Sequence, residues 1–401
     1  MLAPSLEETK VVEKTGQDDF YTSPTAVVYI FGAIDTLVPF VYILNIFSHI
    51  NYWHGATLAI KLLLCCLYFR YISISLTALV SLVVLTAIIL IASIPGGSQI
   101  SDYIRIFGFV AHVFVTLAII RRENLEKYLR ACVGVLFVTT LIYLLAAALG
   151  QINITFGRYS YFHGSHPNLG SEIIAMSIVL AACVLSWLPF LIVTLPSLYA
   201  IHLMEGRAAL IVALIAVGAK FIYDQWDNKK RLALFCGLFV CAGAALVLVS
   251  SKAASVFNSI FLLHDKYRGL GSGFVGRDQL WSTALEWFRA SPIIGNGAGF
   301  FDRNGVEIHN FFLFGLSEFG LLSLIIYGMI FYLFYDLYRT DKKWFVCFLG
   351  IPVFWMFNDR FFNINPYPFL FYVVLFAHAN KARLGIGALP VTQTGLVPHA
   401  R

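Results

Sequence analysis

The chain has 401 residues, of which 59% are hydrophobic and 12% charged, and its formal net charge is +6. Soluble domains contain about 25% charged residues, so this composition excludes an ordinary soluble enzyme, and no nucleic-acid partner is expected. All seven cysteines lie in apolar stretches, which is typical of small core residues and not of disulfides or metal ligands.

Recurring apolar runs predict an all-α fold, a polytopic membrane protein with about twelve transmembrane helices. Residues 1–25 and 381–401 are predicted to be disordered cytoplasmic tails, and residues 26–380 form one transmembrane domain. The predicted spans are 26–48, 55–69, 72–94, 104–120, 131–149, 171–187, 189–204, 208–223, 232–250, 311–337, 344–358 and 367–379.

Lysine and arginine concentrate in alternate connections between the predicted spans, which sets the orientation by the positive-inside rule. Both termini are therefore predicted to be cytoplasmic, and the long loop 251–310 is predicted to be periplasmic, with an interfacial helix in it. The basic residues of the predicted inner connections are Arg70, Arg121, Arg122, Lys127, Arg130, Lys220, Lys229, Lys230, Arg231, Arg339, Lys342, Lys343, Lys381 and Arg383.

The second half of this loop predicts an amphipathic helix over Asp278–Ala290. Asp278 can cap its start, and Pro292 prevents its continuation. A helix of this kind lies on the membrane surface with its apolar face toward the lipid or the protein. The apolar residues that fall on one face at helical spacing are Leu280, Trp281, Ala284, Leu285 and Phe288.

Two arginines in outer connections are candidates for binding an anionic substrate. Arg277 directly precedes the predicted helix, whose N-terminus favours anions, and a guanidinium can donate two parallel hydrogen bonds to phosphate oxygens. Arg207 follows Glu205 in a short turn between two apolar spans, where a charge is costly unless it faces a cavity or a partner. Glu205 would neutralise or orient it. The alternatives are a solvated arginine at position 277 and an ion pair in a wet turn at 205–207.

His309 and Asn310 stand immediately before the apolar span that begins at Phe311. Asn310 is a suitable N-cap, which places His309 at the boundary between water and lipid. A histidine there can accept a proton from a sugar hydroxyl near neutral pH. The alternative is an interfacial histidine without a chemical role.

Two other polar stretches lie in the outer loops. Residues 292–299 contain three glycines at alternate positions and predict a tight turn that lets backbone approach a ligand or a neighbouring segment. His163 and His166 have no carboxylate or cysteine beside them, and Pro167 prevents a regular helix there. A plain turn or a polar rim that contacts sugar is therefore expected there, and not a metal site.

Five short motifs follow one another between residues 160 and 340. They are Ser165-His166-Pro167-Asn168 before a span, Gly206-Arg207 at the start of another, Gly276-Arg277-Asp278-x-x-Trp281, Pro292-x-x-Gly295-x-Gly297, and His309-Asn310 at the entry to an apolar segment. In order and topological placement they resemble the bacterial O-antigen ligase and O-antigen polymerase superfamily. Two outer arginines and one histidine are essential in that family, and the resemblance places them at Arg207, Arg277 and His309.

The resemblance implies a metal-independent, inverting glycosyltransferase of the bacterial inner membrane, with its active site facing the periplasm and without a cofactor. The donor would be a glycan on undecaprenyl diphosphate, and the acceptor a sugar hydroxyl. Arg207 and Arg277 would hold the diphosphate and stabilise the leaving group, and His309 would orient or deprotonate the hydroxyl. The substrate-binding residues expected beside them are Asn310, Glu205, His166, Asn168 and Trp281.

Other activities stay open at this point. The acceptor is lipid A-core in a ligase and another lipid-linked repeat unit in an O-antigen, capsule or exopolysaccharide polymerase; the ligase is favoured slightly. A polysaccharide transporter or flippase would need ionisable groups within the spans. Lys61 and Glu172 are the main candidates, and neither has an obvious partner in the sequence. A structural or sensory protein would not need arginines at helix edges on one common side.

Overall fold

The structure is a computed structural model, and it describes residues 25–46, 50–94, 98–155, 157–162, 166–225, 277–357, 366–379 and 384–385. These residues are almost entirely helical, which confirms the all-α prediction. The helices in chain order are α1 (Thr25–Asp35), α2 (Val38–Ile43), α3 (Ile50–Leu67), α4 (Leu76–Ser93), α5 (Ile100–Ile119), α6 (Arg122–Ala148), α7 (Pro167–Val184), α8 (Trp187–Leu203), α9 (Arg207–Gln225), α12 (Arg277–Ala290), α13 (Phe300–Asn304), α14 (Phe311–Phe319), α15 (Ser323–Thr340), α16 (Lys342–Phe348), α17 (Ile351–Phe357) and α18 (Pro366–Ala379).

Short strands and 3-10 turns complete the described part of the chain. β1 (Ser73–Ile74) pairs antiparallel with β4 (Leu384–Gly385), so part of the tail predicted to be disordered is a strand. β2 (Ile154–Thr155) pairs antiparallel with β3 (Arg158–Tyr159). The 3-10 turns are Phe69–Tyr71 and Gly320–Leu322.

Six helical segments of the described chain are long and apolar enough to cross a membrane, and four shorter helices are also apolar. These segments support a multi-pass membrane protein, but they do not support twelve spans. The predicted span at 232–250 lies outside the described residues. The six segments are Leu76–Ser93, Ile100–Ile119, Arg122–Ala148, Pro167–Val184, Arg207–Gln225 and Phe311–Thr340.

Three predicted spans are each divided into two helices: 26–48, 344–358 and 311–337, the last at the 3-10 turn Gly320–Leu322 between α14 and α15. The first is interrupted after Asp35, and Pro39 lies in the first turn of α2. In the second, Pro352 is the second residue of α17. Proline lacks an N–H and fixes φ, so it suits the first turn of a new helix and not the interior of an old one. Apolar length alone does not reveal such breaks.

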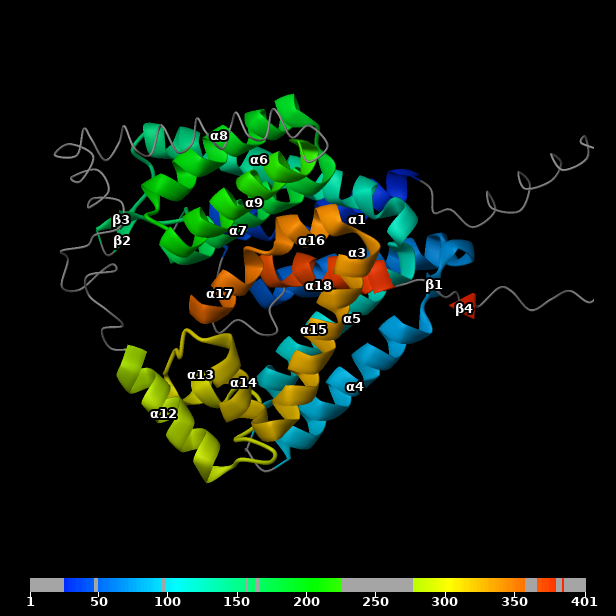
Figure 1. The fold of residues 1–401 in the computed structure, drawn as a ribbon, viewed down its shortest axis with the longest axis vertical. Helices are drawn as coiled ribbons and strands as arrows, with labels where there is room; N and C mark the ends of the chain where they lie inside the picture. The colour runs from blue at the N-terminus through cyan, green and yellow to red at the C-terminus, as the bar shows by residue number, and fades with distance from the viewer. Residues whose placement is uncertain are drawn as a thin grey trace, which may run out of the picture.

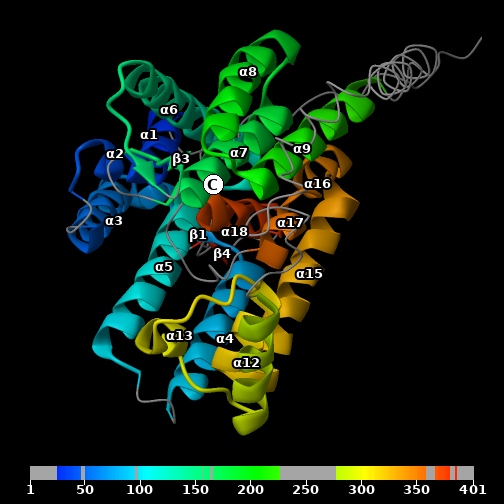
Figure 2. The same ribbon diagram turned by 90° about the vertical axis from the view of Figure 1, so that its left-hand side faces the viewer.

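α7 is the central helix of the bundle and is buried along nearly its whole length. It packs on α6, α8 and α9, as Figures 1 and 2 show. Glycine allows the closest approach here: a Cβ on Gly206 would collide with the Ser171 side chain, so the turn before α9 lies directly on the first turn of α7. In the same way, Gly32 lets α1 lie against the Tyr128 carbonyl of α6.

Connections predicted to share the inner side meet at one end of the bundle. Arg121 Nη2 donates to the carbonyl oxygen of Tyr71 at 2.7 Å, and Arg122 Nη2 donates to that of Thr340 at 3.1 Å. The start of α1 and strand β4 lie at this end, opposite α12 (Figure 1).

The opposite end is held together by ion pairs between α5 and α13. Arg303 Nη1 lies 2.7 Å from Asp102 Oδ2, and Arg105 pairs with Asp302. Both α5 residues lie in the first two turns of that helix, so the connection before α5 and the loop after α12 share one end of the molecule.

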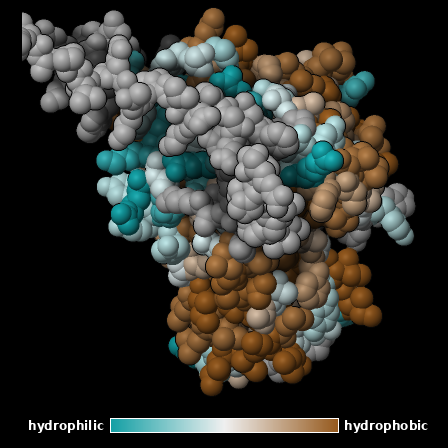
Figure 3. Space-filling view, turned by 90° about the vertical axis from the view of Figure 1, so that its right-hand side faces the viewer, coloured by the Kyte–Doolittle hydropathy of each residue, from teal (hydrophilic) through white to brown (hydrophobic). Residues whose placement is uncertain are grey.

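Large apolar side chains are exposed on the outside of α4 and α15. Figure 3 shows apolar side chains over the lower part of the face where these two helices lie. In water such a surface would be unfavourable, whereas in a bilayer it faces lipid. The exposed residues include Leu76, Val80, Val83, Leu90, Ile91, Leu324, Ile325, Phe331, Tyr332 and Tyr335.

Candidate active site

Arg277 is the first residue of α12, one position before the predicted helix start, and its guanidinium rests on an aromatic ring. Its Cζ lies 5.2 Å from the ring centroid of Phe357, the last residue of α17. Burial lowers the pKa of Arg277, although an arginine remains protonated in proteins. Arg277 therefore combines a fixed positive charge with a helix N-terminus, where anions are favoured.

The buried face of α12 packs on the loop that carries His309. Ala284 is fully buried with Phe301 and Ile308, and Trp281 Nε1 donates to the carbonyl oxygen of Ile308 at 3.2 Å. The predicted apolar face is thus largely correct, except that Leu285 is exposed. Trp281 fixes the backbone directly before His309.

His309 and Asn310 have the geometry expected at a helix entry. Asn310 Oδ1 accepts hydrogen bonds from the backbone N–H groups of Phe312 and Leu313, both at 3.0 Å, which confirms the predicted N-cap. His309 has φ 52°, in the left-handed region, and its Nε2 lies 3.5 Å from Glu307 Oε2. A strained backbone at a residue other than glycine is frequent at functional sites.

Aromatic stacking joins this loop to α17. The ring of Phe311 stacks on Trp355 with centroids 5.3 Å apart, and Phe312 meets Trp355 edge-on at 6.1 Å. Trp355 lies two residues before Phe357, the ring under Arg277. α17 therefore contacts both the arginine at the start of α12 and the segment that follows His309.

Arg207 begins α9 on the other side of α17. Glu205, just before it, has φ 51°, and the intervening Gly206 lies on Ser171 of α7. α17 packs on α9, and a Cβ on Gly350, just before α17, would lie 3.1 Å from the Val212 carbonyl oxygen. The helix that Arg207 starts is thus in contact with the helix that supports Arg277.

His166 and Asn168 lie at the start of α7. His166 is the N-cap, and its Nδ1 accepts from the Asn168 N–H at 3.2 Å. Asn168 Oδ1 accepts from Arg158 Nη1 at 3.0 Å. Pro167 was expected to prevent a regular helix at this place. It is instead the first residue of α7, so it excludes a helix only for the residues that precede it. His163 lies outside the described residues, and no group of three His, Cys, Asp or Glu suited to a metal occurs among the residues described.

The glycine-rich turn contacts a neighbouring segment, one of its two predicted uses. Gly295, Gly297 and Gly299 all have positive φ, at 75°, 89° and 73°. The N–H of Gly297 donates to the carbonyl oxygen of Glu318 at 2.9 Å, and a Cβ on Gly295 would collide with that same carbonyl. The turn therefore holds the end of α14, whose other end carries His309.

The predicted site residues fall into two groups, one around α12 and one at the start of α9, two helices that are labelled in Figure 2. The first surrounds α12 and α14, and the second lies at the starts of α7 and α9. α17 packs on α14 and on α9 and so lies between the groups. The first group is Arg277, Trp281, His309 and Asn310, and the second is His166, Asn168, Glu205 and Arg207.

Sequence patterns alone do not single out Phe357, Arg158 or Trp355. Phe357 contacts Arg277 and Arg158 contacts Asn168, which are predicted site residues. Trp355 contacts the segment that follows His309 and Asn310. Aromatic residues make up 16% of the chain, so the presence of an aromatic residue does not by itself indicate a site residue. The position of Phe357 at the outer end of a predicted span was the only usable hint. Arg158 lies in a predicted outer connection, as Arg207 does, but without a motif.

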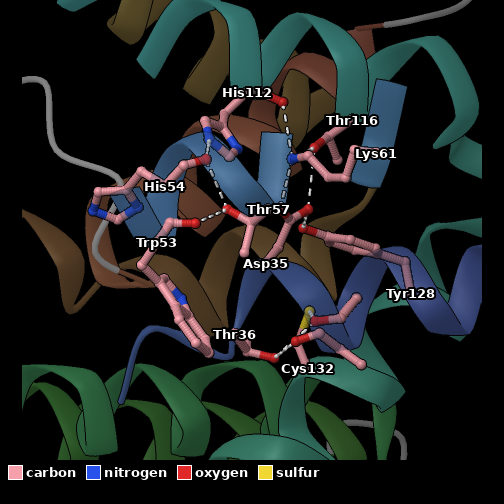
Figure 4. A network of polar contacts seen from close by, with 12 residues as sticks. Asp35, Thr36, Trp53, His54, Thr57, Lys61, His112, Thr116, Tyr128 and Cys132 are labelled. Atoms are coloured by element: carbon pink, nitrogen blue, oxygen red, sulfur yellow. Dashed lines mark hydrogen bonds and ion pairs between the residues drawn. The ribbon is translucent and has the colours of Figure 1, made fainter. Parts of the chain in front are cut away.

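Lys61 has a partner that was not obvious in the sequence. Its Nζ lies 2.6 Å from Asp35 Oδ1 in the interior of the bundle (Figure 4). The second candidate, Glu172, is buried in the first turns of α7. The pair lies on α1 and α3, away from α12, and thus forms a second polar centre.

No family model and no curated protein matches this chain. The resemblance to the O-antigen ligase and polymerase superfamily therefore rests on the five motifs and on their placement.

Proposed function

We propose that the protein is a membrane glycosyltransferase that moves a glycan from undecaprenyl diphosphate to a sugar hydroxyl. The observation that carries the proposal is the position of α17. It touches Arg277 through Phe357, stacks through Trp355 on the segment that follows His309, and packs on the helix that begins with Arg207. The segments that carry Arg207, Arg277 and His309 come from distant parts of the chain, and each of them thus contacts one short helix.

This set of groups suits the proposed chemistry. Arg207 and Arg277 would bind the diphosphate oxygens in bidentate fashion and stabilise the charge that develops on the leaving phosphate. His309 would orient the acceptor hydroxyl or take its proton as it attacks the anomeric carbon. Attack from the face opposite the phosphate inverts that carbon, and the two guanidiniums serve where other enzymes use a metal ion.

The proposed location is the bacterial inner membrane, with the site facing the periplasm. The basic connections at the end opposite α12 support this orientation by the positive-inside rule. α12 would then lie at the outer surface, where the lipid-linked donor presents its diphosphate. Its exposed Leu285 would face the lipid headgroup region.

The acceptor divides the proposal into two activities. We favour ligation of O-antigen to lipid A-core, and the alternative is a polymerase that joins lipid-linked repeat units of O-antigen, capsule or exopolysaccharide. A deletion strain on a glycan gel separates them. Loss of all long chains from lipid A, with lipid-linked polymer retained, indicates a ligase. Single repeat units on lipid A indicate a polymerase.

The transfer reaction is tested with Arg277→Ala and His309→Ala in the full chain. Both variants are expected to reach the membrane in normal amount and to abolish glycan attachment. Arg289→Ala is the matched control, because Arg289 is an exposed basic residue in the last turn of the same helix. Surface glycan in both site variants would reject the assignment.

A polysaccharide transporter or flippase remains the second candidate, and one observation favours it. Asp35 and Lys61 are a partnered pair of ionisable groups within the bundle, which is the feature that a transporter requires. Loss of a transporter would make lipid-linked glycan accumulate on the inner face of the membrane, whereas loss of a transferase leaves it on the outer face.

A further inference from the structure

A buried ion pair lies where the first apolar helix is interrupted. Asp35 is the last residue of α1, and α2 begins at Val38. Lys61 Nζ of α3 lies 2.6 Å from Asp35 Oδ1, and the two side chains are 0% and 2% exposed. Interrupted membrane helices that place an ionisable group at the break are a recurring design of proton and sodium sites.

The two charges are thoroughly hydrogen-bonded in this conformation (Figure 4). Besides Asp35, Lys61 Nζ donates to Thr116 Oγ1 at 2.8 Å and to the His112 carbonyl oxygen at 3.3 Å. Asp35 Oδ2 accepts from Thr116 Oγ1 at 3.0 Å and from the Tyr128 hydroxyl at 2.9 Å. Three acceptors match the three N–H groups of an ammonium, so the geometry describes a carboxylate with a protonated lysine.

Packing alone does not require this pair. Apolar residues of similar volume often stabilise a buried site as well or better, because two charges lose their hydration. The pair is instead a neutral unit that gains a net charge whenever one proton is added or removed. Other groups that face it from the helices packed around it are Cys65 of α3, His112 of α5, Tyr128 and Cys132 of α6, and the rings of Phe31 and Phe369.

Two imidazoles extend from the pair toward the start of α3. His112 Nε2 lies 3.1 Å from the His54 carbonyl oxygen, and the two rings are 6.3 Å apart. The Nδ1 atoms of both histidines are buried and have no hydrogen-bond partner among the described residues. Buried polar atoms of this kind mark positions for ordered water. His54 is only half-buried, so this route reaches toward the surface.

We propose that Asp35 and Lys61 form a proton-exchange site inside the membrane, reached from the start of α3 past His54 and His112. A proton from water adds to the Asp35 carboxylate, and the hydrogen bond from Lys61 Nζ to that carboxylate breaks. The ammonium keeps its hydrogen bonds to Thr116 Oγ1 and to the His112 carbonyl oxygen. The reverse step returns the proton to water. Because a lone buried ammonium is unfavourable, protonation favours opening at the break between α1 and α2.

Infrared difference spectroscopy of the full chain in liposomes tests this site directly. When alkaline buffer is replaced by acidic buffer, the wild type is expected to gain C=O bands of buried carboxylic acids. Asp35→Asn is expected to lack one of these bands, while those of the buried Glu172 and Glu318 remain. Asp302→Asn, which alters an exposed carboxylate at the other end of the molecule, is expected to leave the band unchanged. Identical difference spectra for the wild type and Asp35→Asn at every pH would overturn the proposal.

Asp35→Asn leaves a buried ammonium without its counter-charge, so a second variant keeps the test informative. The double variant Asp35→Asn/Lys61→Met removes both charges, and it is expected to fold and to lack the band. The route is tested by His112→Phe, which is expected to slow the appearance of the band after a pH jump severalfold and to leave its final size unchanged. An unchanged rate would overturn the route past His112.

Proton exchange at Asp35 is compatible with either a transferase or a transporter. It is measured without any glycan, so its failure is distinguishable from the failure of the transfer reaction.

Discussion

The guanidinium of Arg277 lies over the ring of Phe357, with Cζ 5.2 Å from the centroid. This contact joins the first residue of α12 to the last residue of α17, although 80 positions separate them in the sequence. α17 also packs on α9 and α14, so the helix whose last ring contacts Arg277 lies against the helix that begins at Arg207 and the helix that follows His309. Phe357 is therefore a positioning residue for the proposed transfer.

Phe357→Leu removes the ring beneath Arg277 and keeps an apolar side chain. A cation–π contact of this kind contributes about 1 kcal/mol, so transfer is expected to slow about fivefold. Phe357→Tyr keeps the ring and should retain the wild-type rate. The rate is measured as glycan attachment over time in membranes with matched protein levels. Equal rates for Leu and wild type would remove Phe357 from the site.

The left-handed backbone conformation of His309 allows the catalytic role of its side chain to be tested separately from its effect on stability. A residue with a Cβ at positive φ lowers the free energy of unfolding by roughly 1 kcal/mol, and Gly and Asn tolerate that region best. His309→Gly and His309→Asn are therefore expected to melt at or above the wild-type temperature in detergent, and yet to support no transfer. Normal transfer by His309→Asn would mean that the imidazole is not needed.

Local patterns predicted part of this architecture well. The helical spacing of apolar residues predicted α12, and the Asn310 side chain predicted the start of α14, because caps and amphipathic faces are decided within one or two turns of chain. The breaks after Asp35, before α17 and between α14 and α15 were not predicted. Hydropathy measures apolar length, and it does not register where a helix path bends within a membrane.

Long-range contacts were beyond the reach of sequence patterns. Lys61 and Asp35 are 26 residues apart on two helices, and only the packing of α1, α3, α5 and α6 brings them together. The same holds for the contacts of α17 with Phe311 and Arg277. A single sequence does not show which distant helices pack on one another. The motifs therefore predict candidate site residues, but they do not predict that α17 contacts the segments that carry them.

Asn310→Ala tests whether the cap of α14 holds His309 in place. Both cap hydrogen bonds, to the N–H groups of Phe312 and Leu313, are lost, at a cost of about 1 kcal/mol. Thermal stability and transfer are both expected to fall. Asn310→Asp keeps an acceptor at the same position and is expected to restore stability. If Asn310→Asp and Asn310→Ala are equally destabilised, the Asn310 side chain does not stabilise the protein by capping α14.

The turn at Gly295 offers the sharpest packing test, because the same loop contains a matched control. Gly295 has φ 75° and its Cβ position is filled by the Glu318 carbonyl, whereas Gly305 has φ 63° and no atom within 4 Å of its Cβ position. Gly305→Ala should therefore cost only the conformational strain, about 1–2 kcal/mol.

Gly295→Ala incurs the same strain and, in addition, forces the turn away from α14. It is expected to melt at a clearly lower temperature than Gly305→Ala and to lose more transfer, since displacement of the end of α14 also moves His309 at its start. The two proteins are compared by thermal unfolding in detergent and by glycan attachment in membranes. Equal melting temperatures would show that the turn does not hold α14, and the support of His309 would then have to come from Trp281 and Asn310 alone.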